Sequence, residues 1–178
     1  MGENQKRIAL PTQKGFIIHA TEVVPAGAPE NVMVLDDKGK IQTIKREKDS
    51  PNVGLSLHYP LLRPTAQFTN QQPEPSLYTT VTLHLIKPGN SEELHYDEYN
   101  AEMPIYDVAL FVISGQIRVT VGDIEKTVGA DTLIYSPSNV TRSLTNVGTD
   151  VAKILRMSGS VGGAKMGRPV YSKRPTWI

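Results

Sequence analysis

The chain contains no cysteine among its 178 residues. This absence excludes disulfide bonds, thiolate metal sites and cysteine nucleophiles from any account of the protein. Aromatic residues are also scarce, at 6% of the total, and Trp177 is the single tryptophan. A chain of this length fits one domain and leaves an interior large enough for a sizeable apolar core.

A surplus of charge of either sign is missing as well. The 19 basic and 18 acidic side chains give a formal net charge of +1, whereas a dedicated nucleic-acid binder needs a strongly basic face. The longest apolar run, residues 108–113, is far too short to span a membrane. Residues 1–20 lack the apolar stretch of a signal peptide. We therefore expect no nucleic-acid partner, no membrane partner and a cytoplasmic location.

Helical periodicity is the third feature that the sequence lacks. No stretch of useful length repeats apolar residues at the spacing of a helix, so we expect little helix. Short β-prone runs instead follow one another with glycine and proline between them, which is typical of a sandwich or barrel. The expected strands are residues 15–20, 32–35, 41–44, 55–62, 77–86, 108–114, 116–121, 124–128, 132–135, 142–145 and 152–157. The runs 32–35 and 41–44 flank an acidic, glycine-containing turn and predict a hairpin.

Two spaced motifs stand out in the second half of the chain. In the first, five residues separate Gly89 from His95-Tyr96-Asp97, and an insertion of about six residues precedes the apolar strand that ends before Gly115. In the second, Pro137 leads through Asn139 and Arg142 to Asn146.

These two motifs resemble the signature motifs of the cupin superfamily, the RmlC-like jelly-roll proteins. The resemblance covers residues 77–157 and implies an all-β fold, a double-stranded β-helix or jelly-roll barrel. We divide the chain into an N-terminal β extension over residues 1–75, a cupin barrel over residues 76–158 and a basic C-terminal tail over residues 159–178. The extension is expected to pack on the barrel or on a partner subunit, within one structural domain overall.

The departures from the family pattern concern metal binding. A metal-binding cupin resembling the pattern has three histidines and one glutamate directed into the barrel, and of these positions only His95 keeps its ligand. Asp97 takes the place of the second histidine and can still ligate through its carboxylate. Val108 stands at the glutamate position, and Arg142 stands at the third histidine position, where its permanent positive charge repels a divalent metal.

We therefore predict no cofactor, although a divalent metal at His95 and Asp97 stays open as an alternative. Such a metal would need substitute ligands, for which the sequence offers His84, Glu98, Glu102 and Asp107.

The same residues also suggest a site without metal. Alternate residues of a strand face the same way, so His95 and Asp97 are expected to point into the barrel together, as a general base and the group that orients it. Arg142 would face them and bind the carboxylate or phosphate of a small molecule. His84 and Tyr135 are further candidates for substrate binding. In the opposing interpretation, Arg142 and Asp97 only neutralise each other and His95 is hydrogen-bonded to backbone.

Three functions follow from these alternatives. The first is a metal-independent isomerase, lyase or cyclase that acts by proton transfer on a small anionic or carbohydrate-like molecule, with one of Tyr78, Tyr99, Tyr106 and Tyr135 as the acid. The second is a barrel that binds or senses a small molecule without catalysis. The third is a metal-dependent cupin of the oxygenase or decarboxylase type with rearranged ligands.

The expected assembly is a homodimer. Strands ahead of the motif region need partners at their edges, and Tyr171 and Trp177 could anchor an otherwise polar tail on a sister subunit. The sequence therefore predicts a dimer in which the N-terminal strands or the tail are exchanged.

Overall fold

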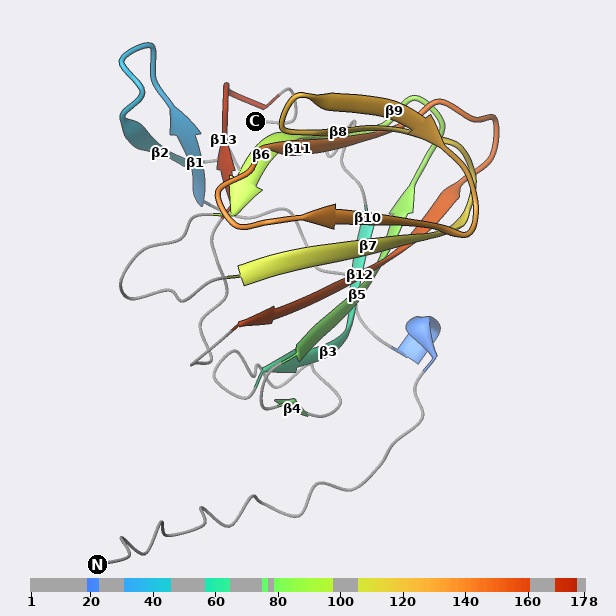
Figure 1. Ribbon diagram of the computed structural model, residues 1–178. Helices are drawn as coiled ribbons and strands as arrows, with labels where there is room; N and C mark the ends of the chain where they lie inside the picture. Colours follow the sequence, from blue (N-terminus) through green and yellow to red (C-terminus); the bar gives the residue numbers. More distant parts are fainter. Residues whose placement is uncertain are drawn as a thin grey trace, which may run out of the picture.

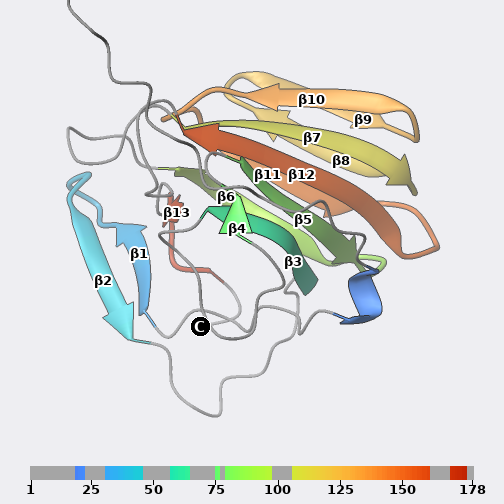
Figure 2. The same cartoon turned by 90° about the horizontal axis from the view of Figure 1, so that it is seen from below.

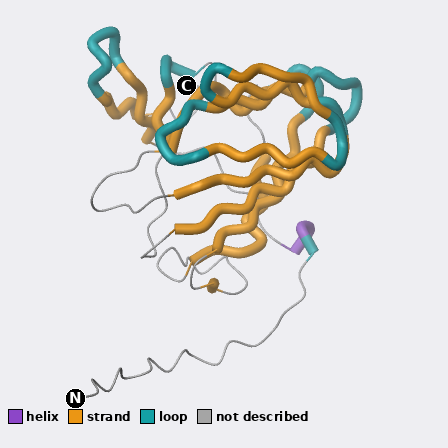
Figure 3. The backbone as a smooth tube through the Cα atoms, in the orientation of Figure 1, coloured by secondary structure: helices purple, strands orange, loops and turns teal. Residues whose placement is uncertain are grey.

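The computed structural model describes residues 19–22, 31–45, 57–64, 75–76, 79–97, 106–160 and 169–175. In these residues two β-sheets face each other and enclose the interior of a barrel (Figure 1). The fold is an all-β jelly-roll, as the sequence predicts. Figure 3 shows how completely strands dominate the described chain. No helix in this part of the chain is long and apolar enough to cross a membrane.

The larger sheet contains seven strands in the order β2-β1-β13-β6-β11-β8-β9. These are β1 (Asn31–Leu35), β2 (Ile41–Lys45), β6 (Ser91–Asp97), β8 (Ile117–Val121), β9 (Ile124–Val128), β11 (Arg142–Asn146) and β13 (Pro169–Tyr171). The smaller sheet contains six strands in the order β10-β7-β12-β5-β3-β4. These are β3 (Leu57–Pro64), β4 (Pro75–Ser76), β5 (Thr79–Ile86), β7 (Tyr106–Ser114), β10 (Thr132–Ser136) and β12 (Ala152–Ser160).

Most of the expected strands are confirmed, including the hairpin β1–β2 around the acidic turn at Asp36. One expected strand, over residues 15–20, is wrong in the part that the structure describes. The expected strand 15–20 ends at Ala20, where a 3-10 helix, η1 (Ala20–Glu22), begins instead. Residues 15–18 lie outside the described residues.

The C-terminal segment, expected as a basic tail, contributes a strand to the fold. Its strand β13 lies between β1 and β6 in the larger sheet, parallel to β1 and antiparallel to β6 (Figure 2). Val170 and Tyr171 are buried in this position. Tyr171 therefore packs within its own chain, and its side chain is not free to anchor on a sister subunit.

The interior of the barrel is built by regular alternation along the strands. On β5 and β11 every second described side chain is buried, as are Ala152, Ile154 and Ser158 on β12, as expected for strands with one face toward a core. The apolar members form one continuous cluster. They are Ile86, Val108, Leu110, Val112, Ile117, Val119, Ile134, Leu144, Ala152 and Ile154.

Two backbone positions support the motif alignment. Gly115 closes the first motif at φ 94°, and a Cβ there would lie 2.7 Å from the Cβ of Ala152, so only glycine fits. Asn139, at the glycine position of the second motif, has φ 60°. Asparagine tolerates this left-handed conformation better than most residues. Its backbone N–H donates to the carbonyl of Asp97 at 3.3 Å, which ties the second motif to the first.

Candidate functional site

A β-bulge in β6 determines which of its side chains enter the barrel. Arg142 of β11 pairs with His95, but Leu144, two residues further, pairs with Glu92, so Glu93 and Leu94 together oppose one residue of β11. A bulge of this kind changes the alternation of side chains along a strand. As a result Glu92 approaches the same buried group as His95 and Asp97, although a regular strand would place it on the opposite face.

Asp97 is the centre of a buried cluster of charges. Its Oδ2 accepts hydrogen bonds from Nη2 of Arg142 at 2.7 Å and from Nη2 of Arg156, on β12, at 3.0 Å. Burial alone would raise the pKa of the Asp97 carboxyl, but the two guanidinium groups outweigh it and hold the pKa below its usual value. Asp97 is therefore ionised at neutral pH and is shared by two permanent cations.

His95 is held in one orientation and one tautomer. Its Nδ1 lies 2.7 Å from the carbonyl oxygen of Glu93, which can only accept, so Nδ1 carries the proton. When the ring is neutral, Nε2 presents a lone pair and accepts from Nη2 of Arg142 at 3.1 Å. Oε1 of Glu92 lies 3.3 Å from the same Nε2. A proton added to Nε2 would therefore find a carboxylate beside it.

Two further histidines lie next to Glu92. His84 of β5 is fully buried, and its Nδ1 is 3.2 Å from Oε2 of Glu92, although neither atom makes a hydrogen bond of good geometry. His58 of β3 pairs directly with His84 across the strands and stacks on its ring, with centroids 3.9 Å apart. Burial lowers the pKa of both imidazoles, to about 3 for His58, so both rings are neutral at pH 7.

A divalent metal fits one part of this site better than another. The guanidinium of Arg142 bonds both His95 and Asp97, so a metal at this pair, the alternative left open by the sequence, does not fit. His58, His84 and Glu92 each offer one ligand atom, and these atoms lie within 4.8 Å of one another. These three residues could hold a metal ion.

The structure places the residues predicted from the sequence as follows. His95, Asp97, Arg142 and His84 meet in the barrel interior, and Asp97 and Arg142 form the neutralising pair of the opposing interpretation. Tyr135 does not join them, which corrects its expected place in the substrate site. Ile134 and Ser136 are the inward residues of β10, so Tyr135 is 55% exposed, and its hydroxyl donates to Asp107 at 2.7 Å.

Other candidates fall outside what the structure describes. Tyr78, Tyr99, Glu98 and Glu102 lie outside the described residues, as does the side chain of Tyr106. Asp107, the remaining substitute ligand, bonds Tyr135 and the backbone N–H of Ser138 instead of contacting the histidines.

Four residues of the cluster were not found as site residues by sequence reasoning: His58, Glu92, Arg156 and Tyr171. Arg156 had a usable signal, because it stands two residues after the inward Ile154 and two before the inward Ser158. His58 and Tyr171 had none, because they come from segments outside the motifs. The Tyr171 ring lies 5.4 Å from that of His95.

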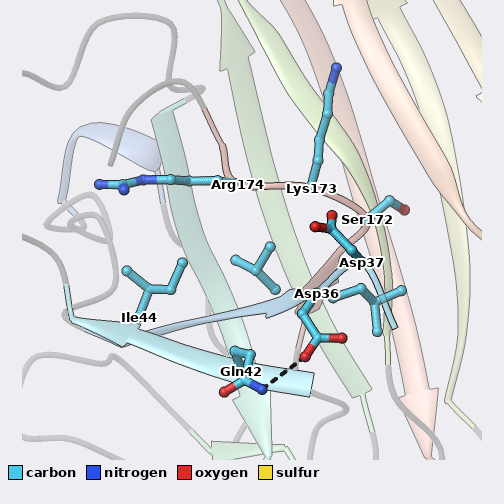
Figure 4. A pocket seen from close by; sticks show the side chains of 9 residues that line it. Asp36, Asp37, Gln42, Ile44, Ser172, Lys173 and Arg174 are labelled. Carbon is cyan, nitrogen blue, oxygen red and sulfur yellow. Dashed lines mark hydrogen bonds between the residues drawn. The ribbon is translucent and has the colours of Figure 1, made fainter. Parts of the chain in front are cut away.

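A separate pocket opens on the molecular surface, between the β1–β2 hairpin and the chain that follows β13 (Figure 4). Its volume is about 460 Å³. Its lining contains two acidic residues, Asp36 and Asp37, and two basic residues, Lys173 and Arg174, so its formal charges cancel. Asp36 is bonded to Gln42 and to backbone N–H groups of its own turn (Figure 4). This balance gives the pocket no preference for ligand charge.

The fold and the interior cluster define a small jelly-roll barrel with a polar centre formed by its two motif regions. Residues 82–157 match the family model of the cupin domain. This match supports the assignment of these residues to the cupin superfamily, as the spacing of the motifs predicts.

One solved structure supports the fold, and two others are less similar to the chain. The polyketide cyclase RemF from Streptomyces resistomycificus is 12% identical, with a TM-score of 0.57 over 92% of this chain and 89% of that chain. The Cnp3 cupin domain from Schizosaccharomyces pombe is 13% identical, with a TM-score of 0.47 over 74% and 86%. KdgF from Halomonas sp. is 9% identical, with a TM-score of 0.47 over 61% and 82%. No curated protein matches the chain in sequence.

Proposed function

We propose that the barrel binds a small anionic molecule, with a carboxylate or phosphate group, at the cluster formed by Asp97, Arg142 and Arg156. The observation that carries this proposal is the sharing of one carboxylate by two guanidinium groups. Asp97 is one carboxylate shared by two permanent cations, and it lies in a buried place, where charge interactions are strong.

A second feature of Arg142 favours an anionic ligand. Its Nε is buried and has no hydrogen-bond partner among the described residues. An unsatisfied buried donor costs about 1–3 kcal/mol, which an acceptor oxygen of a ligand would relieve. Glu92, the second carboxylate of the site, lies beside His84 and His95 in the described contacts.

The same arrangement supports proton transfer on the bound molecule, with His95 as the general base. Its tautomer is fixed by the Glu93 carbonyl, its Nε2 lone pair points at the arginine cluster, and Glu92 stabilises the ring once it is protonated. An isomerase, lyase or cyclase that moves one proton needs these elements, and neighbouring arginines would stabilise the negative charge that develops on the ligand.

Binding is tested by calorimetric titration with glucose 6-phosphate, inorganic phosphate and neutral glucose. We expect both phosphates to bind and glucose not to bind. Arg142→Gln should weaken phosphate binding by about tenfold or more, since charge-assisted hydrogen bonds contribute about 1.5–3 kcal/mol. The matched control is Arg118→Gln, which removes an exposed arginine of β8 and should change nothing. Equal binding of glucose and glucose 6-phosphate, or unchanged binding in Arg142→Gln, would contradict the proposal.

Catalysis is tested separately from binding. A panel of 2-oxo acids and sugar phosphates is incubated with the protein in D2O, and exchange of ligand C–H for deuterium is followed by NMR. His95→Gln should abolish exchange while phosphate binding persists. Phosphate binding without exchange of any panel member would favour the alternative function, a barrel that binds a small molecule without catalysis.

The homodimer expected from the sequence stays a prediction. The outer face of the smaller sheet supports it, because one uncharged row crosses five strands there through Leu133, Phe111, Leu155, Leu83 and Tyr59. A second copy could cover this row without bringing like charges together. Light scattering should give the mass of two chains, and Leu133→Glu should reduce it to one, whereas Ile124→Glu, at an exposed position of the other sheet, should not.

A further inference from the structure

We infer that His58, His84 and Glu92 form a binding site for a divalent transition-metal ion, displaced from the motif positions at which Val108 and Arg142 replace ligands. The three residues come from the adjacent strands β3 and β5 and from β6 of the facing sheet. Their ligand atoms lie within 4.8 Å of one another. This inference goes beyond the proposed anion binding and does not depend on it.

The geometry is already close to that of a metal site. Two ligand atoms that are each about 2.1 Å from a tetrahedral ion lie about 3.4 Å apart. The distance between Nδ1 of His84 and Oε2 of Glu92 is 3.2 Å, so this pair needs no rearrangement. His58 stacks on His84 at an interplanar angle of 14°, and a tilt of its ring would bring a nitrogen toward the same point.

The hydrogen bonding of His84 and Glu92 leaves ligand atoms available. Both ring nitrogens of His84 and Oε2 of Glu92 are buried and have no hydrogen-bond partner among the described residues. His84 is completely inaccessible to solvent. Buried polar atoms of native proteins are satisfied in the great majority of cases, and a bound metal ion is one way to satisfy them.

The ligand set also indicates the class of metal and the kind of ligand expected at its open coordination position. Two imidazoles and one carboxylate form a common three-residue set for catalytic zinc and for related first-row ions. Three protein ligands leave a coordination position open. Arg142 and Arg156 contribute positive charge near His84, so an anion or hydroxide is the ligand that balances the charge at this position.

A neighbouring side chain also holds the Glu92 carboxylate in place. Its other oxygen, Oε1, lies 3.3 Å from His95, whose ring is itself fixed by the carbonyl of Glu93. Outer-shell contacts of this kind orient ligands and tune their affinity for the metal. The Glu92 carboxylate would then lie between the metal ion and His95, the proposed base.

The test is a zinc titration of the full chain, purified without a histidine tag and stripped with EDTA. We expect one Zn²⁺ per chain. Glu92→Gln and His58→Gln keep the size of the side chain and should each weaken binding by about 100-fold or more, since even loss of an outer-shell partner weakens it by about 10–100-fold. His19→Gln, which changes an exposed histidine that bonds Thr21, should bind zinc like the unmodified protein.

His95→Gln separates the two metal positions. It should weaken zinc binding by about 10–100-fold, as expected for loss of an outer-shell partner, if the ion lies at the proposed site, and should abolish binding if the ion lies at His95 and Asp97. An NMR experiment on the unmodified protein guards against variants that fold poorly. The imidazole nitrogen signals of His58 and His84 should shift on addition of one equivalent of Zn²⁺, while those of His19 should not. Absence of a bound ion, or equal affinity in Glu92→Gln, would overturn the inference.

Discussion

The interior of the barrel consists of two regions with opposite chemistry, an apolar half and a polar half. The change between them takes place within single strands. Ile86 and His84 on β5, Leu144 and Arg142 on β11, and Ile154 and Arg156 on β12 are each two residues apart on one inward face. The same alternation along the strands therefore directs the residues of both halves into the barrel. The fold itself does not require polar residues at these inward positions.

The two halves should contribute differently to stability. Burial of the apolar half is favourable at about 25 cal/mol per Å² of apolar surface. In the polar half, removal of charges from water offsets much of the attraction between them, so a buried ion pair is weak evidence for stability. We interpret the apolar half as the part that holds the barrel together and the polar half as the part retained for its chemistry.

The largest expected loss of stability comes from a substitution in the polar half. Asp97→Ala leaves the guanidinium groups of Arg142 and Arg156 buried without their shared carboxylate. Loss of one partner of a buried ion pair costs about 3–5 kcal/mol, and we expect a loss of this size in the free energy of unfolding measured with urea. Asp123→Ala, in an exposed turn, is the control and should change stability by less than about 0.5 kcal/mol. Equal results for the two variants would mean that the cluster is solvated.

The apolar half is tested by Leu110→Ala. Leu110 is completely buried in the apolar cluster, and truncation of a buried leucine costs about 2–5 kcal/mol. Ile113→Ala, at a position of the same strand that is 44% exposed, should cost less than about 1 kcal/mol in the same urea experiment. Phosphate binding should survive Leu110→Ala. Its loss would show that the two halves do not act separately.

The two halves should also differ in their response to acid. Because the pKa of Asp97 is lowered in the folded protein, its contribution to stability is present above the ordinary value of 3.8 and is lost as the pH falls toward the folded value. We expect the free energy of unfolding of the unmodified protein to fall below about pH 4, and Asp97→Asn to lack this part of the decrease. The same decrease in both proteins would assign the acid sensitivity to other carboxylates.

The smallest expected effect lies at Ser136, which is fully buried next to Val108 of the apolar half. Its hydroxyl has no hydrogen-bond partner among the described residues. Removal of an unsatisfied buried hydroxyl should be neutral or should stabilise the protein by up to about 1 kcal/mol, so Ser136→Ala should unfold at the same or a slightly higher temperature. A clear decrease would show that the hydroxyl belongs functionally to the polar half.

The sequence was sufficient for the barrel and for the part of the site that lies within its motifs. The spacing of His95, Asp97 and Arg142 placed them together because motif positions and strand alternation are both local properties. Glu92 was missed because a bulge reverses the alternation, and nothing in the residues themselves marks a bulge. His58 was missed because its contact with His84 depends on the pairing of β3 with β5, and no motif in the sequence marks that pairing.

The position of β13 has a consequence for how the chain is made. The N-terminal hairpin is joined to the barrel through β13, where Met33 pairs with Val170 and Tyr171 pairs with His95. A ribosome completes the hairpin long before β13, so in the meantime the inner edge of β1 lacks the strand with which it pairs in the folded protein. Contacts between such distant parts of a chain form slowly. Until they form, the edge of β1 is open to strands of other nascent chains, and this is where we expect a chaperone to be needed.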